Sequence, residues 1–173
     1  MLVGILLLSP LGMAKENKSN VSFNNQKYEL AYSEGAKGIW LNEYLLPGET
    51  LNAWTKMVAL RTYGNAAVSP KEAAIQVARN LMASNPQAKY AIHENSKTGE
   101  VLLDFVTWDR TVEEFNAFKF ATINGGLVSL QFAFRTYNDV AAMEKFMKTQ
   151  RTDILQKFAN MKIPEVQEVT KLK

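Results

Sequence analysis

The sequence contains no cysteine and only one histidine, His93. Without cysteine the chain cannot form disulfides, thiolate zinc sites or cysteine nucleophiles. Zinc and non-haem iron sites usually need two or three imidazoles, which a single histidine cannot supply. The sequence therefore predicts no bound metal and no other cofactor.

The net charge of the chain is also small. The chain has 20 lysine and arginine residues against 17 acidic ones, which gives a formal net charge of +3, and the two signs are interspersed. Binding to a phosphate backbone needs several basic side chains on one face, because affinity grows with the number of phosphates neutralised. The sequence thus predicts that nucleic acid is not a partner.

Motifs for common chemistries are missing as well. The chain has no Gly-x-Gly-x-x-Gly or Walker loop for nucleotides, no EF-hand loop for calcium and no Gly-x-Ser-x-Gly elbow for a serine hydrolase. These absences favour a protein that is not an enzyme. The alternative is a small hydrolase in which His93 works with a nearby carboxylate, Asp104 or Asp109.

Two acidic residues, Asp104 and Glu43, lie in segments whose other residues are largely apolar. One interpretation makes them inward-facing acids with a raised pKa, which is typical of functional sites. The other places them at an edge or beside an arginine such as Arg61 or Arg135.

The first residues predict export. Residues 2–8 form an uncharged apolar run, and Gly12 and Ala14 fit the small-residue rule for signal peptidase, so we expect cleavage between Ala14 and Lys15. No lysine or arginine precedes the run, which departs from the usual signal pattern. The run is shorter than the about 20 residues that span a bilayer, so no stable membrane anchor is expected after cleavage. The mature protein would be periplasmic or secreted.

One domain should follow this segment. A chain of 173 residues, 47% of them hydrophobic, is long enough for a single buried core. We expect a signal peptide over residues 1–14, a flexible lead-in over 15–26, one α+β domain over 27–161 and a C-terminal tail over 162–173.

Alternation of apolar and polar residues, bounded by turn-forming residues, predicts the strands of this domain. The strongest hairpin signal is Asn124-Gly125-Gly126. The expected strands cover residues 27–32, 39–46, 54–63, 88–94, 100–108, 111–123 and 127–137.

Two helices complete the pattern. Ser69, Pro70 and Glu72 form a capping box with proline at the first helical position, and Asn85-Pro86 ends this helix. A long final helix is expected from Asn138 to Met161, where apolar residues repeat at intervals of three, four or seven.

The order β-β-β-α-β-β-β-β-α predicts an α+β domain with a curved antiparallel sheet of about six or seven strands and two helices. Together with the segment 42–51, Trp54 and the hairpin at Asn124-Gly125-Gly126, this order resembles the PsbP/Mog1-like α/β/α sandwich and small exported bacterial proteins of unknown function. The resemblance implies docking and accessory roles rather than one chemistry, and it assigns no site residue.

The expected function is therefore that of a non-catalytic exported accessory or binding module. Its partner would be an envelope protein or a small apolar ligand. One candidate surface is the segment 44–54, where polar residues interrupt apolar ones; its members are Tyr44, Pro47, Glu49 and Trp54.

The second candidate surface is the strand 111–123, which is apolar on both sides because Phe118 and Phe120 lie opposite Phe115 and Ile123. Such a strand needs cover on both faces, from helices or from a partner. If both helices cover one face, the other presents an apolar patch. If the helices lie on opposite faces, only the segment 44–54 remains.

Overall fold

The computed structural model describes residues 20–64 and 67–163. The expected signal peptide, the first part of the lead-in (15–19) and most of the C-terminal tail (164–173) lie outside these residues.

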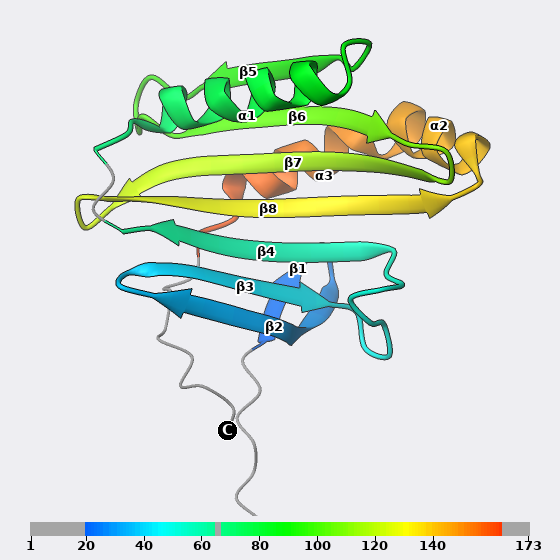
Figure 1. Cartoon of the computed structure of the whole chain (residues 1–173), viewed down its shortest axis with the longest axis horizontal. Helices are drawn as coiled ribbons and strands as arrows, with labels where there is room; N and C mark the ends of the chain where they lie inside the picture. Colours follow the sequence, from blue (N-terminus) through cyan, green and yellow to red (C-terminus); the bar gives the residue numbers. More distant parts are fainter. Residues whose placement is uncertain (1–19, 65–66, 164–173) are drawn as a thin grey trace, which may run out of the picture.

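Within this part of the chain, eight strands form one open antiparallel sheet in the order β1-β2-β3-β4-β8-β7-β6-β5 (Figure 1). The α+β class is confirmed, whereas the expected count of six or seven strands is too low. The strands are β1 Asn20–Phe23, β2 Gln26–Ala36, β3 Ile39–Leu45, β4 Lys56–Tyr63, β5 Tyr90–Glu94, β6 Val101–Trp108, β7 Val112–Ile123 and β8 Gly126–Tyr137.

The additional strand, β1, corrects the expectation of a flexible lead-in over 15–26. Residues 20–23 pair with the start of β2, and Val21 and Phe23 are buried in the core. Asn24 and Asn25, both with positive φ, form the two-residue turn that a tight hairpin requires. This strand has only two apolar residues, Val21 and Phe23, within a polar segment, so the alternation was too short to predict it.

The helices in the described residues number three: α1 Pro70–Ser84, α2 Val140–Thr149 and α3 Arg151–Asn160. The capping box that begins α1 is confirmed, because the Ser69 hydroxyl accepts from the Glu72 N–H and the Glu72 carboxylate accepts from the Ser69 N–H.

The single long helix expected from Asn138 is wrong. The chain leaves helical geometry at Gln150, which has φ −122°, and continues as α3. Each short helix buries its own apolar residues, which are Met143 and Phe146 in α2 and Ile154 and Phe158 in α3. A bend between them lets both pairs reach a twisted sheet that one straight helix could not follow.

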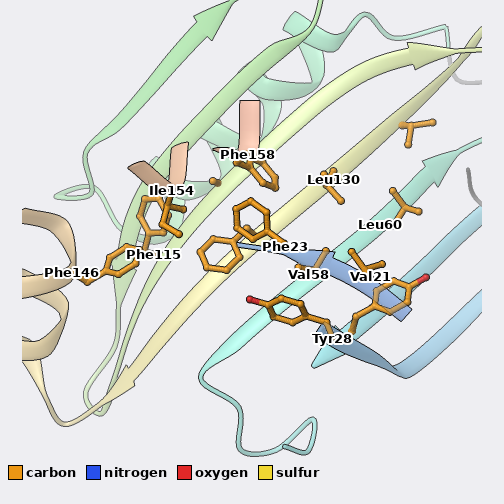
Figure 2. Packing of buried hydrophobic residues seen from close by; sticks show 14 of the residues in the cluster. Val21, Phe23, Tyr28, Val58, Leu60, Phe115, Leu130, Phe146, Ile154 and Phe158 are labelled. Carbon is orange, nitrogen blue, oxygen red and sulfur yellow. The ribbon is translucent and has the colours of Figure 1, made fainter. Parts of the chain in front are cut away.

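The helices lie on opposite faces of the sheet. α1 packs in front of β5, β6 and β7, whereas α2 and α3 pack behind β7 and β8 (Figure 1). We call the first the one-helix face and the second the two-helix face. The largest core lies on the two-helix face, where Phe23 and Phe158 lie together (Figure 2). The ring of Phe23 is 5.0 Å from that of Phe132 and 5.7 Å from that of Phe158, measured between centroids.

Candidate functional site

The strand β7 is covered on both faces, so its predicted binding surface is absent. Phe118 and Phe120 are 6% and 1% exposed and lie in the cluster beneath α1. Phe115, on the other face, packs against Phe146 of α2. The proposal that Phe118 and Phe120 form a surface is therefore wrong, because the two helix layers sandwich this strand.

In the segment 44–54, the two aromatic candidates, Tyr44 and Trp54, are buried and do not form a surface. Tyr44 is buried in the core of the two-helix face, and Pro47 is exposed. Trp54 is buried, with its ring centre 3.9 Å from the guanidinium carbon of Arg135. Its backbone N–H donates to the Tyr137 hydroxyl (3.2 Å), which donates in turn to the Trp54 carbonyl (2.9 Å). Trp54 thus anchors the loop onto the sheet.

Glu49 closes the same loop. Its Oε1 accepts from the backbone N–H and the hydroxyl of Thr55, at 2.9 and 2.6 Å. Its Oε2 and the Tyr28 hydroxyl are buried without a hydrogen-bond partner among the described residues. Burial raises the pKa of Tyr28, and the charge of the nearby Glu49 raises it further. The Glu49 carboxylate therefore holds its own loop through Thr55, and its Oε2 is buried rather than exposed to solvent.

The histidine and the acids considered for catalysis do not come together. His93 is exposed on the edge strand β5. Asp104 is buried on β6, and its Oδ2 accepts from Nε and an Nη of Arg151 at 2.8 and 2.5 Å. Asp109 accepts from the backbone N–H groups of Thr111 and Val112, which lower the pKa of its carboxyl.

Asp104 lies beside an arginine, as one of the two interpretations expected, but this arginine is Arg151 and not Arg61 or Arg135. Arg135 instead pairs with Glu114, at 2.5 Å, and Glu43 is half-buried on β3. No group of three histidine or acidic side chains gathers to hold a metal ion in residues 20–64 and 67–163.

The structure offers a different candidate site, at the end of β6. Two cavities of about 520 and 570 Å³ meet there and share Val106, Trp108 and Met147 in their walls. We call the combined hollow the Trp108 groove. The first cavity lies beside the start of β5 and is also lined by Tyr90 and Arg151. The second lies between the turn after β6 and the start of α2, where Val140 and Met143 line it.

A difference in strand length creates this groove. The first residue of β5, Tyr90, pairs with Phe105, so the last part of β6, Val106 to Trp108, runs beyond its neighbour. Trp108 is left 44% exposed, with its side chain on the face that α2 covers. The groove is therefore formed by the end of β6 and α2 together with the connecting residues before β5 and after β6.

Eight apolar or aromatic side chains line the groove beside eight charged ones, and the charges balance. Four basic and four acidic residues line the two cavities, namely Lys89, Arg110, Lys148, Arg151, Asp104, Asp109, Glu113 and Glu144. Several are already engaged: Arg151 pairs with Asp104, and Lys148 with Glu144 at 3.2 Å. The arrangement suits a neutral, apolar occupant better than an ion.

The comparisons with known proteins agree with the unknown-function part of the expectation. The model of a protein family whose function is uncharacterised matches residues 16–163. No curated protein matches the chain in sequence. Among the described residues, no helix is long and apolar enough to cross a membrane.

Proposed function

We propose that this chain, which belongs to the uncharacterised family that matches residues 16–163, is a non-catalytic binding module with the Trp108 groove as its site. The observation that carries the proposal is Trp108, a large apolar side chain left 44% exposed where two cavities meet. Small-molecule sites are usually concave, mostly apolar pockets with a volume of about 300–1,000 Å³.

The chemistry of the lining supports the same function. Met143 and Met147 supply flexible, polarisable surface that adapts to occupants of different shape. Trp108 offers a broad apolar face, and Val140, at the start of α2, is more than half exposed beside it. A neutral apolar molecule, or an apolar side chain of an envelope protein, would release water from all of these surfaces.

We further propose that the module is exported and works in the periplasm or outside the cell. The apolar run over residues 2–8, followed by Gly12 and Ala14, supports this location. Mass spectrometry of the protein from its native host should find a product that begins at Lys15. A cytoplasmic product that still carries residues 1–14 would contradict export.

The helix layers on both faces of the sheet also support the proposed likeness to the PsbP/Mog1-like fold.

The test of binding is titration of the purified protein with the neutral fluorescent probe N-phenylnaphthylamine. We expect saturable enhancement of probe fluorescence that Trp108→Ala weakens about tenfold, since burying a large side chain contributes about 1.5–3 kcal/mol. Val140→Glu should weaken it similarly, because the new carboxylate enters an apolar wall while still favouring a helix N-terminus.

Leu51→Ala is the matched control. Leu51 is exposed to the same fraction as Trp108, 44%, and lines neither cavity. It should leave the affinity for the probe unchanged. Equal affinity of the Trp108→Ala variant and the wild type, with both folded by circular dichroism, would remove the groove as the site.

A further inference from the structure

A third cavity lies on the part of the one-helix face that α1 leaves uncovered. Among the described residues, no helix lies in front of the strands β2, β3 and β4 (Figure 1). The cavity measures about 440 Å³ and is lined by residues of these three strands. Trp108 has its side chain on the opposite face, so this cavity is separate from the Trp108 groove.

The strand register shows which side chains form this cavity. Residues directly opposite each other in an antiparallel pair point to the same face of the sheet. Six of the lining residues form two rows across the sheet, and each row takes one residue from each of the three strands. The rows are Glu34–Leu41–Arg61 and Ala36–Ile39–Tyr63. β3 therefore supplies the floor of the cavity, and β2 and β4 supply its two walls. We call this hollow the Arg61 trough.

The floor of the trough is apolar. Ile39 is 58% exposed, which leaves most of its side chain open to an occupant. Leu41 is half-buried and packs against the cluster that contains Met57 and Ala59. An apolar group that lay on this floor would cover the exposed surface of Ile39 and release water from it.

Two opposite charges lie on the two walls without an ion pair. The Arg61 side chain is half-buried, yet it has neither a hydrogen bond nor an ion pair within residues 20–64 and 67–163. The other two half-buried arginines of these residues, Arg135 and Arg151, each pair with a carboxylate. Glu34 also lacks an ion pair there, and its Oε2 accepts from the Tyr32 hydroxyl. Arg61 thus has an open place for an anionic group.

The distance between the two walls limits the size of the occupant. Neighbouring strands lie about 4.8 Å apart, so Glu34 and Arg61, on the outer two of three strands, are about 10 Å apart at the backbone. Both side chains stand roughly perpendicular to the sheet, which keeps a similar distance between their charges. A charge-assisted hydrogen bond at each end takes about 2.8 Å, which leaves about 4 Å between a cation and an anion of the occupant. The two charges of an α-amino acid fit this interval, whereas the two termini of a peptide lie further apart.

A further carboxylate, that of Glu43, argues against an occupant with one charge only. Glu43 follows Leu41 by two residues on β3 and shares its face, is half-buried, and forms no ion pair in the described residues. An occupant with a negative charge alone would be repelled by Glu34 and Glu43. An occupant with a positive charge alone would leave Arg61 without a partner. A molecule that carries both charges satisfies both walls.

We propose that the Arg61 trough is a second binding site, and that its ligand is a free α-amino acid with an apolar side chain. The Arg61 guanidinium holds the carboxylate through its paired N–H donors, and Glu34 accepts from the ammonium group. The apolar side chain lies on Ile39 and Leu41. The inference does not depend on the proposed function, because the Trp108 groove lies on the other face of the sheet.

The test is titration of the full chain with leucine, followed by nuclear magnetic resonance. We expect saturable shifts of the Ile39 and Leu41 amide resonances. Arg61→Gln and Glu34→Gln should each weaken the binding of leucine about tenfold or more, because each removes one charged partner of the ligand. Arg79→Gln is the matched control: Arg79 is an exposed arginine of α1 that lines none of the three cavities, and its loss should leave the affinity for leucine unchanged.

Analogues of leucine separate the contributions of its charges and of its side chain. N-acetyl-leucine keeps only the carboxylate, and leucine amide keeps only the ammonium group, so each should bind about tenfold or more weakly than leucine. Glycine keeps both charges but has no side chain to cover Ile39, and it should also bind more weakly. These comparisons need only the wild-type protein, so they still decide the question if a variant does not fold.

Several results would overturn the inference. One is equal affinity of the wild type and the Arg61→Gln variant for leucine, with both folded. Another is binding of N-acetyl-leucine or of glycine as tight as that of leucine. A third is the absence of saturable shifts with leucine, isoleucine and methionine at millimolar concentrations. Binding of N-phenylnaphthylamine should be the same in the wild type and in Arg61→Gln, so these results leave the test of the Trp108 groove unaffected.

Discussion

Replacing Phe23 by alanine tests whether β1 belongs to the core. Phe23 is 5% exposed and contacts the rings of Phe132 and Phe158. Truncating a buried phenylalanine to alanine costs about 3–5 kcal/mol. β1 is an edge strand, so the loss cannot exceed the free energy of detaching it, and we expect about 3 kcal/mol, at the lower end of the range.

The assay is urea unfolding followed by circular dichroism, with a thermal scan beside it. A loss of this size should lower the melting temperature by roughly 6–12 °C for a domain of this length. Ser22→Ala, at the exposed neighbouring position of β1, should change the free energy of unfolding by less than about 0.5 kcal/mol. If the two variants unfold alike, residues 20–23 lie outside the core and the reasoning fails.

Three further predictions concern charged and polar residues. Arg151→Ala should lower the free energy of unfolding in urea by about 3 kcal/mol, because it leaves the Asp104 carboxylate buried without its partner. Lys148→Ala breaks an exposed ion pair and should lower it by less than about 0.5 kcal/mol. Equal losses in the two variants would refute this. Hydrogen bonds from Ser69 lower the pKa of Glu72, so its stabilisation is present at neutral pH and lost as the pH falls through that lowered pKa. The melting temperatures of wild type and Glu72→Gln should therefore differ at pH 7 and converge as the pH falls through that lowered pKa, and a constant gap would contradict this. His93→Ala should leave stability and any background turnover of p-nitrophenyl acetate unchanged, and loss of such turnover would favour the hydrolase alternative.

Local signals in the sequence predicted the local structure well. The capping box at Ser69 depends on residues three apart, and the Asn124-Gly125 turn depends on two residues that tolerate positive φ. Both are decided by neighbours in the chain, so the sequence alone is sufficient for them. The break at Gln150 has no such signal, because it depends on the curvature of a sheet made by distant segments.

The candidate site was harder to predict for the same reason. Trp108 lies in a correctly expected strand, but its exposure depends on where β5 stops pairing and on where α2 lies. A hint was present, since the strand expected over 100–108 was longer than its neighbour over 88–94. Trp54, by contrast, looked like a surface residue because nothing nearby in sequence indicates its contact with Arg135.

The lengths of the strands also bear on how the protein behaves at high concentration. In the described part of the chain, the outermost strands of the sheet have four and five residues, against 12 in each of the central strands β7 and β8. Long unpaired margins recruit the margins of other molecules and grow into aggregates, whereas short ones offer too few bonds to hold a second sheet. The taper at both margins therefore favours a protein that stays dispersed when crowded.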